Sequence, residues 1–415
     1  MGLLAAALAL FLAVPAAATP SARPSTAGGA TELRVATFNA SLNRGAAGEL
    51  TADLSAPGDA QAAAVAEVVQ RNRPDVLLVN EFDHVPPTDP ADPRSSPPVA
   101  GFLDNYLGVG QGGAAPIDYP YVYLAPSNTG VPSGLDLNRD GAVGGPDDAW
   151  GFGFFAGQYG MLVLSRYPID VDGVRTFQQF RWADMPGALL PDDPATEEPG
   201  DFWPEDVRSQ VRLSSKSHWD VPVVVGGRAV HLLASHPTPP VFDGPEDRNG
   251  RRNHDEIQFW ADYVTPRAAG YVYDDQGRRG GLAPAARFVV AGDLNSDPLD
   301  GDSLPGSVQQ LVEHPRVNTS LTPRSAGAVE AAALQGGAND AHRGDPATDT
   351  ADFADGAPGN IRADYVLPSR TLRLVDAGVF WPVRADPLSR LTGAFPFPTS
   401  DHRLVWVDVV VPGRG

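Results

Sequence analysis

The feature that most limits the fold is a set of short apolar runs, rich in Val and Leu, that end in polar residues. Runs of this length and composition are typical of buried β-strands and are too short for the helices of a globular core. The predicted strands cover residues 33–38, 76–79, 161–164, 221–225, 230–234, 288–291, 365–367 and 404–411.

Two longer segments show helical periodicity. Residues 59–73 place Ala62, Val65, Val68 and Val69 on one face, with Asp59 as the N-cap, and residues 253–264 form a second amphipathic segment. Strands outnumber helices, so we expect a sandwich of sheets flanked by helices. Long insertions rich in Pro, Gly and Asp interrupt this pattern, and loops of that length are often functional. They cover residues 86–116, 128–158 and 181–206.

The charge of the chain limits its partners and its metals. Lys and Arg total 31 and Asp and Glu total 51, for a formal charge of −20, whereas nucleic-acid binders normally show a basic face. Acidity suits divalent cations. Because the chain has no cysteine, any metal must be held by oxygen and histidine ligands, which favours Mg²⁺, Mn²⁺ or Ca²⁺.

The N-terminus has the pattern of a secretory signal. The apolar run at residues 3–14 is too short to span a bilayer comfortably, and an A-x-A cleavage pattern follows it at residues 16–18. We therefore expect a signal peptide at 1–18, a flexible leader at 19–30, a single domain at 31–415 and secretion of the protein. A lipid-facing anchor is the alternative for this segment. No other segment is predicted to span a membrane, and no protein partner is predicted.

Polar residues cluster where the predicted strands stop or start. They are Asn39, Glu81, His236, Asp293, Asn295, Asp364, Asp401 and His402. Strand ends are where sheets of this class bind ligands. Hydrolysis of a phosphoester needs a hard cation held by oxygen ligands, a base that aims a water, and donors that stabilise the transition state. The set contains residue types for all three tasks.

These residues lie in segments that resemble the endonuclease/exonuclease/phosphatase superfamily. The segments are ATFN (36–39), VNE (79–81), SHPTPP (235–240), GDLNSDP (292–298), ADYVL (363–367) and SDH (400–402), and they follow the order of the family. The resemblance implies a four-layer α/β/β/α sandwich of two mostly antiparallel sheets flanked by helices. It also implies a metal-dependent phosphoric ester hydrolase, with Asn39 and Glu81 at the metal, Glu81 as the principal ligand, and Asp401 near it.

The resemblance implies roles for the other residues as well. Asp293 orients the attacking water or protonates the leaving group, and Asn295 contacts the scissile phosphate. His402, held by Asp364, is a general base or a phosphate contact. His236 polarises the phosphate or serves as an acid, and its presence favours the deoxyribonuclease and sphingomyelinase branch.

Two further segments are candidates for phosphate contact. Arg248, Arg251, Arg252 and His254 form a dense basic stretch after His236, and arginine offers bidentate donors to phosphate. The alternative for this stretch is a solvated loop and helix start. The second candidate is the segment at residues 214–220, which precedes a predicted strand.

A separate calcium site is predicted in the insertion at residues 136–147. Asp136, Asn138, Asp140 and Gly141 match the first positions of an EF-hand loop, and Asp147 stands where Glu is usual. Helices flanking the loop are not evident, and the alternative is a polar turn without an ion. The expected role of Ca²⁺ here is structural.

Three functions remain open from the sequence. The first is hydrolysis of phosphomonoesters or phosphodiesters of small or lipid-derived substrates, which the acidic charge and the aromatic residues of the insertion at 177–206 favour. The second is an extracellular nuclease acting on DNA or RNA, favoured by His236 and secretion and opposed by charge. The third is a non-catalytic binding module.

Overall fold

The computed structural model describes residues 29–413. The predicted signal peptide, and all of the predicted leader except its last two residues, lie outside these residues. Within the described range, no helix combines the length and the apolar character needed to cross a bilayer.

Two sheets form the centre of the molecule, and every predicted strand is present. In the first sheet the order is β12 (Arg373–Val379), β13 (Val405–Val411), β1 (Thr31–Leu42), β2 (Val76–Phe82), β4 (Met161–Ser165) and β3 (Tyr121–Tyr123). In the second the order is β11 (Asp364–Pro368), β8 (Arg287–Asp293), β7 (Arg228–Ser235), β6 (His218–Val225) and β5 (Arg175–Thr176). β9 (Ala351–Asp352) and β10 (Asn360–Ile361) form a separate pair.

Neighbouring strands in the two larger sheets are antiparallel except for two pairs. β1 runs parallel to β2, and β7 runs parallel to β8. The prediction of two mostly antiparallel sheets is therefore confirmed. The sequence did not indicate β12, because three of its seven residues are exposed and Asp376 interrupts its apolar residues.

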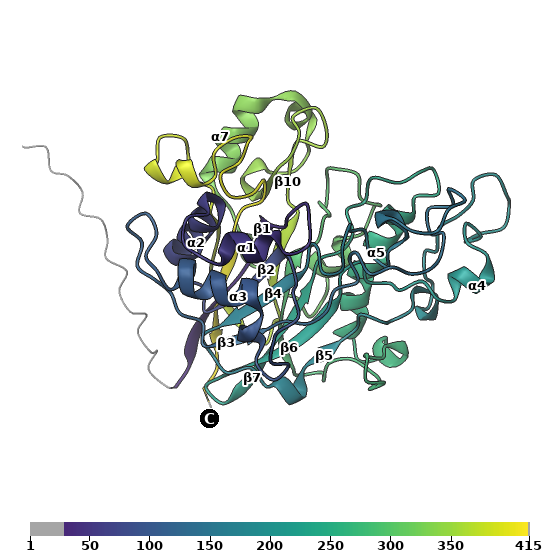
Figure 1. Cartoon of the computed structure of the whole chain (residues 1–415), viewed down its shortest axis with the longest axis horizontal. Coiled ribbons are helices and arrows are strands. Elements are labelled where there is room, and N and C mark those ends of the chain that lie inside the picture. The colour runs from purple at the N-terminus through teal and green to yellow at the C-terminus, as the bar shows by residue number, and fades with distance from the viewer. Residues whose placement is uncertain (1–28, 414–415) are drawn as a thin grey trace, which may run out of the picture.

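Three apolar layers hold the sandwich together. The layer between the sheets contains residues from both, such as Val35 and Leu78 from the first and Val221, Leu232 and Val289 from the second. A second layer lies between the first sheet and the helices around α2 (Ala60–Asn72), and a third lies between the second sheet and α5 (Arg248–Tyr263). Figure 1 shows these two helices on opposite sides of the strands, which confirms the four-layer architecture.

Helix α2 forms where its periodicity predicted it. The side chain of Asp59 caps it by accepting a hydrogen bond from Ala62 N at 2.7 Å, and the helix stops at Arg73, which has a left-handed backbone. The remaining helices are short. They are α1 (Glu49–Leu54), α3 (Pro97–Gly101), a π-helical turn (Phe102–Leu107), α4 (Glu205–Arg208), α6 (Gln309–Val312) and α7 (Ala326–Gln335).

Helix α5 begins five residues before the predicted start at residue 253. The first turn of α5 is polar, so it could not be recognised from a periodic pattern of apolar residues. A free backbone N–H of this turn, that of Asn249, donates a hydrogen bond to the Asp243 carboxylate at 2.6 Å. Asp255 and Glu256 consequently lie about two turns into the helix. Both are buried and accept hydrogen bonds from neighbouring loops.

Candidate active site

The strand register brings the polar strand ends to one edge of the sandwich. β11 runs antiparallel to β8, so the start of one meets the end of the other, and Asp364 pairs directly with Asp293. β13 runs antiparallel to β1 with Val405 opposite Thr37, which places the segment before β13 beside the end of β1. Residues far apart in sequence therefore meet because of the direction of pairing.

Asn80 links the two sheets at this edge, and Gly292 allows the close approach of β7 and β8 within the second sheet. Asn80 accepts hydrogen bonds from Thr37 Oγ1 at 3.1 Å and from Asp293 N at 3.3 Å. Gly292 lies so close to Ser235 of β7 that a Cβ atom would stand 1.9 Å from the Ser235 carbonyl oxygen. The glycine of the GDLN segment is therefore required by the approach of the two strands.

Glu81 projects into the site from the end of β2. Its carboxylate accepts hydrogen bonds from Asn39 Nδ2 at 3.1 Å and from Asn43 Nδ2 at 2.7 Å. Its backbone has φ of 57°, in the left-handed region that glutamate rarely adopts, and such strain often accompanies a functional position. Burial raises the pKa of Glu81, while the Asn39 bond opposes that change.

Asp293 lies between the two histidines at the centre of the site. Its Oδ2 is 3.4 Å from His236 Nε2 and 3.5 Å from His402 Nε2, and it accepts a hydrogen bond from Asn39 Nδ2 at 3.0 Å. Its Oδ1 accepts from Asn295 N at 2.9 Å. Burial raises the pKa of Asp293 to about 7, which suits a group that exchanges protons near neutral pH.

The two histidines have opposite electrostatic surroundings. His402 Nδ1 is 2.8 Å from Asp364 Oδ2, and although burial lowers its pKa, the Asp364 and Asp293 carboxylates raise it well above the ordinary value. Burial lowers the pKa of His236 well below that value, and Lys216 and His402 add to the effect. His402 is therefore a cation at neutral pH, and His236 is a neutral imidazole.

Asp364 is held by a residue that the sequence did not single out. Thr350 Oγ1 donates to Asp364 Oδ2 at 2.8 Å, beside the bond from His402. Asn295 is nine-tenths buried, with φ of 50°, and its Nδ2 donates to Pro237 O at 3.2 Å. Asp401 also lines the site, next to His402. All eight predicted residues are thus brought together at one end of the sandwich.

Six of these residues line a cavity of about 730 Å³, namely Glu81, His236, Asp293, Asn295, Asp401 and His402. Aromatic and aliphatic side chains build most of its wall. They include Phe152, Trp182, Trp203, Val241, Phe242 and Ile361. Most aromatic residues of the insertion at 177–206 pack into the core, and of these only Trp182 and Trp203 line the cavity.

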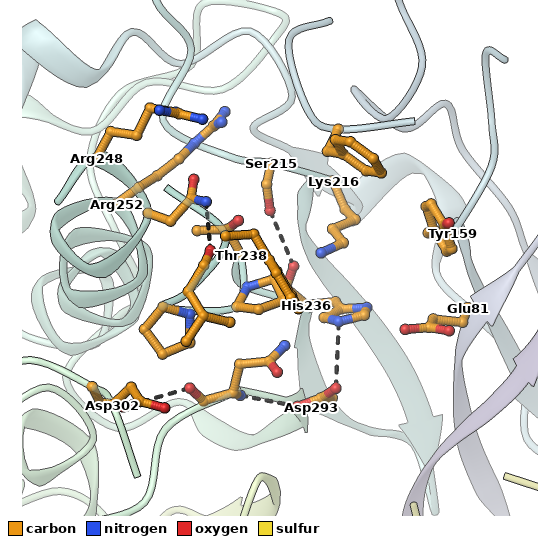
Figure 2. Close-up of a pocket in the computed structure, with 18 of the residues that line it drawn as sticks. Glu81, Tyr159, Ser215, Lys216, His236, Thr238, Arg248, Arg252, Asp293 and Asp302 are labelled. Carbon is orange, nitrogen blue, oxygen red and sulfur yellow. Dashed lines mark hydrogen bonds and ion pairs between the residues drawn. The ribbon is translucent and has the colours of Figure 1, made fainter. Parts of the chain in front are cut away.

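The basic stretch on α5 is largely engaged by the protein itself. Arg252 donates hydrogen bonds to the carbonyl oxygens of Leu213, Trp150, Arg212 and Ser214. Arg248 pairs with Glu246, Arg251 donates to Leu190 O, and His254 bonds to Asp255. Only Arg248 and Arg252 line the cavity, and Figure 2 shows them across it from Glu81. The stretch is helical, not a loop.

The predicted calcium loop is folded by its own hydrogen bonds. Asp136 accepts from the backbone N–H groups of Asp140 and Gly141, and Asn138 Nδ2 donates to Asp140. Asp147 was the predicted ligand at the end of the loop, but it lines the cavity. The neighbouring Asp148 carboxylate contacts the loop and accepts hydrogen bonds from Leu137 N and Gly144 N. Within residues 29–413 no α-helix adjoins the loop, which ends in a 3₁₀ turn at Pro146–Asp148.

The residues fit a divalent cation at Glu81. The Glu81 carboxylate is hydrogen-bonded by two neutral amides and by no guanidinium or ammonium group of the described chain, and the Asn39 amide oxygen accepts only from Ser41 N. Ligand atoms of Asp293, Asp364 and His402 also lie within 4.8 Å of one another. The His402 ring is already bonded to Asp364 through Nδ1, whereas the Glu81 carboxylate and the Asn39 amide oxygen have no charged hydrogen-bond partner in the described chain, so Glu81 is the better ligand.

Known proteins provide an independent comparison. The model of the Endonuclease/Exonuclease/phosphatase family matches residues 36–402. The comparison with curated proteins returned no match.

The chain is similar to three solved bacterial structures. The endonuclease/exonuclease/phosphatase from Beutenbergia cavernae DSM 12333 is 19% identical, with a TM-score of 0.46 over 92% of this chain and 72% of that chain. A family protein from Leptotrichia buccalis C-1013-b is 12% identical, with a TM-score of 0.46 over 91% and 99%. A double mutant of beta toxin from Staphylococcus aureus with bound magnesium ions is 12% identical, with a TM-score of 0.41 over 91% and 99%.

Proposed function

The chain belongs to the endonuclease/exonuclease/phosphatase family and is therefore a metal-dependent phosphoester hydrolase, and we propose that it is secreted and acts on small or lipid-derived phosphoesters. The observation that carries the substrate proposal is the cavity. Catalytic groups line it, and aromatic and aliphatic side chains form most of the remaining wall. Such a wall suits a substrate that carries an apolar group beside its phosphate.

The electrostatics favour such a substrate over a nucleic acid. A duplex is held by basic side chains along its phosphates. Here Arg252 is engaged by four carbonyl oxygens and Arg248 by Glu246, and the chain carries a charge of −20. Family membership also disfavours a non-catalytic binding module. An extracellular nuclease is the outcome that would contradict this proposal.

We assign roles to the residues from their surroundings. Asp293, with its pKa near neutrality, accepts the proton of the attacking water. His402, kept cationic by Asp364, stabilises charge on the phosphoryl oxygens, and Asn295 adds a neutral donor. His236 lines the cavity, and its Nδ1 atom is buried without a hydrogen-bond partner in the described chain, so we assign this imidazole to a contact with the substrate.

The metal completes the site on the Glu81 side. Glu81 and Asn39 would hold the cation, with Asp401 close by. A divalent cation bound there supplies Lewis-acid polarisation of a phosphoryl oxygen. Mg²⁺ or Mn²⁺ suits these oxygen ligands, and Ca²⁺ at residues 136–147 remains a prediction for a structural site.

A substrate panel tests the proposal. The purified protein with Mg²⁺ is assayed against p-nitrophenyl phosphate, bis-p-nitrophenyl phosphate, sphingomyelin vesicles and plasmid DNA, with Asp293→Asn as the inactive control. We expect at least one small or lipid ester to be cleaved with a higher kcat/KM than DNA. Cleavage of plasmid DNA with all three esters untouched would show that the enzyme is a nuclease.

The apolar wall has its own test. Phe242 lines the cavity, is 85% exposed and has a left-handed backbone with φ of 68°. Replacing it with Ser removes apolar surface without emptying the core. We expect Phe242→Ser to raise the KM for a long-chain phosphoester about tenfold and to leave the KM for p-nitrophenyl phosphate unchanged. Equal effects on both substrates would argue against an apolar subsite.

Secretion rests on the N-terminal sequence and is tested separately. Expressed in a bacterial host with a general secretion pathway, the full chain is expected in the medium or periplasm with residues 1–18 removed. N-terminal sequencing identifies the cleavage point. Retention of the intact chain in the membrane fraction would support the anchor alternative.

A further inference from the structure

One residue of the cavity is unique in the whole chain. Lys216 is the only lysine in the sequence, and the other basic residues among the 31 Lys and Arg are all arginines. It is also buried, with 6% of its surface exposed, and it lines the cavity that holds Glu81, Asp293 and His236. The only lysine side chain of the sequence therefore lies in the cavity that holds the candidate active site.

The backbone on both sides of Lys216 is held firmly. Ser215 N and Ser215 Oγ both donate to Glu256 Oε1 of α5, at 2.6 and 3.0 Å. The carbonyl oxygen of Lys216 accepts from Asn128 N at 2.8 Å. Glu256 also accepts from Thr238 N at 2.7 Å, so one buried carboxylate fixes the segment of Lys216 and the segment that follows His236.

The ammonium itself is not used by the fold. Within residues 29–413 it makes no hydrogen bond, although Glu81, Asp293 and Glu256 are close enough to act on it electrostatically. Figure 2 shows the side chain directed toward His236, between the Arg252 side and the Tyr159 side of the cavity. His236 Nδ1 also lacks a partner in the described chain. Lys216 and His236 both line the cavity, and each keeps a side-chain nitrogen without a hydrogen bond within residues 29–413.

We propose that the Lys216 ammonium binds a phosphoryl oxygen of the substrate, as a second positive charge in the cavity beside that of His402. This inference rests on the proposed function. A buried cation is costly unless it is paired, and a substrate phosphate supplies the missing partner. The arginines nearest the cavity cannot replace it, because Arg252 and Arg248 are already bonded to protein groups.

The choice of lysine over arginine also follows from the site. An ammonium is a compact point charge with three donors, whereas a guanidinium is a wide planar fork. The segment is closely packed, since a Cβ atom at Gly151 would lie 1.7 Å from the Ser215 carbonyl oxygen. A lysine reaches the phosphate through a thin methylene stem that fits this space.

The absence of cysteine from the chain allows a direct chemical test. Lys216→Met keeps the apolar stem and removes the charge. Lys216→Cys creates the single thiol of the protein, and 2-bromoethylamine converts it to an aminoethyl thioether that carries an amine at nearly the lysine position. Arg166→Met, which removes a cation at the far end of β4, is the matched control. Thermal unfolding verifies the fold of every variant.

Two readouts are measured, and they separate this inference from the proposed function. We expect Lys216→Met to lower kcat/KM for the best phosphoester about 100-fold and to weaken binding of inorganic phosphate, measured by calorimetry with Mg²⁺ present, at least tenfold. Aminoethylation should restore both for Lys216→Cys and neither for Lys216→Met. Arg166→Met should match the wild type.

Other outcomes are equally informative. If the wild type cleaves phosphoesters and Lys216→Met retains activity and phosphate binding within threefold, the inference is wrong and the proposed function stands. If the wild type binds inorganic phosphate through Lys216 but cleaves no ester, the proposed function fails while the phosphate site is supported. If the wild type binds no phosphate, the inference is overturned.

Discussion

His218, in the strand that follows Lys216, should make the stability of the protein depend on pH in a defined way. Its ring is buried, with Nδ1 2.6 Å from Ser214 Oγ and Nε2 2.9 Å from the carbonyl oxygen of Glu256. A neutral ring that donates from Nε2 and accepts at Nδ1 satisfies both contacts. A second proton on Nδ1 would force Ser214 to give up its donated bond.

The magnitude follows from the shift in its pKa. Burial lowers the pKa of His218 from 6.5 to about 4. Below pH 6.5 the unfolded chain therefore binds a proton on His218 that the folded chain does not bind. The free energy of unfolding consequently falls as pH decreases from 6.5 toward 4, and His218 does not change it above about pH 7. Between pH 7.5 and pH 5 this one histidine should reduce the free energy of unfolding by about 2 kcal/mol.

A difference measurement isolates that term from other titrating groups. Urea unfolding of the wild type and of His218→Gln is compared at steps between pH 7.5 and 5. The glutamine does not titrate, so the stability gap between the two proteins should narrow by about 2 kcal/mol as pH falls. Ser214→Ala is the control, because it removes the hydrogen bond but keeps the titrating ring. Parallel curves for the wild type and His218→Gln would refute the reasoning.

Three further predictions concern the site. Removing divalent cations with EDTA should abolish hydrolysis, and Mg²⁺ should restore it without refolding, as followed by activity and circular dichroism. Asp364→Asn should lower kcat about 100-fold with an unchanged melting temperature, because His402 loses the charge that keeps it cationic; activity within threefold would contradict that role. Gly292→Ala should destabilise the protein by roughly 3 kcal/mol or more, measured by urea unfolding, because its Cβ would overlap the Ser235 carbonyl; a neutral effect would show that β7 and β8 can separate.

The strands and the site edge were predictable for a physical reason. A strand buried on both faces needs a continuous apolar run, and each run must end where its backbone reaches solvent, so the polar residue after it marks the sheet edge. Asn39, Glu81, His236 and Asp293 were all found in this way. β12 and the first turn of α5 were missed because they carry exposed or polar residues and leave no apolar period.

Residues that act through buried polar contacts were also missed. Glu256 and Thr350 look like ordinary helix and loop residues in the sequence, and only the fold shows that they hold the segments of Lys216 and Asp364. The basic stretch on α5 shows the reverse case, in which a feature that is prominent in the sequence has mainly structural contacts in the fold. Its charges are conspicuous in the sequence, yet Arg252 is engaged by carbonyl oxygens that only tertiary structure brings to it.

The sequence by itself determined the apolar runs, the polar residues that end them, the absence of thiol ligands and the presence of a single lysine. These are local properties, because burial of a strand and the chemistry of a side chain depend on residue type and spacing. The tertiary structure decided which strand ends meet, which of the charged groups are engaged and what lines the cavity. Those depend on contacts between residues far apart in the sequence, such as Asn39 with Asp293 across the two sheets and His402 with Asp364, which only the folded chain brings within hydrogen-bonding distance.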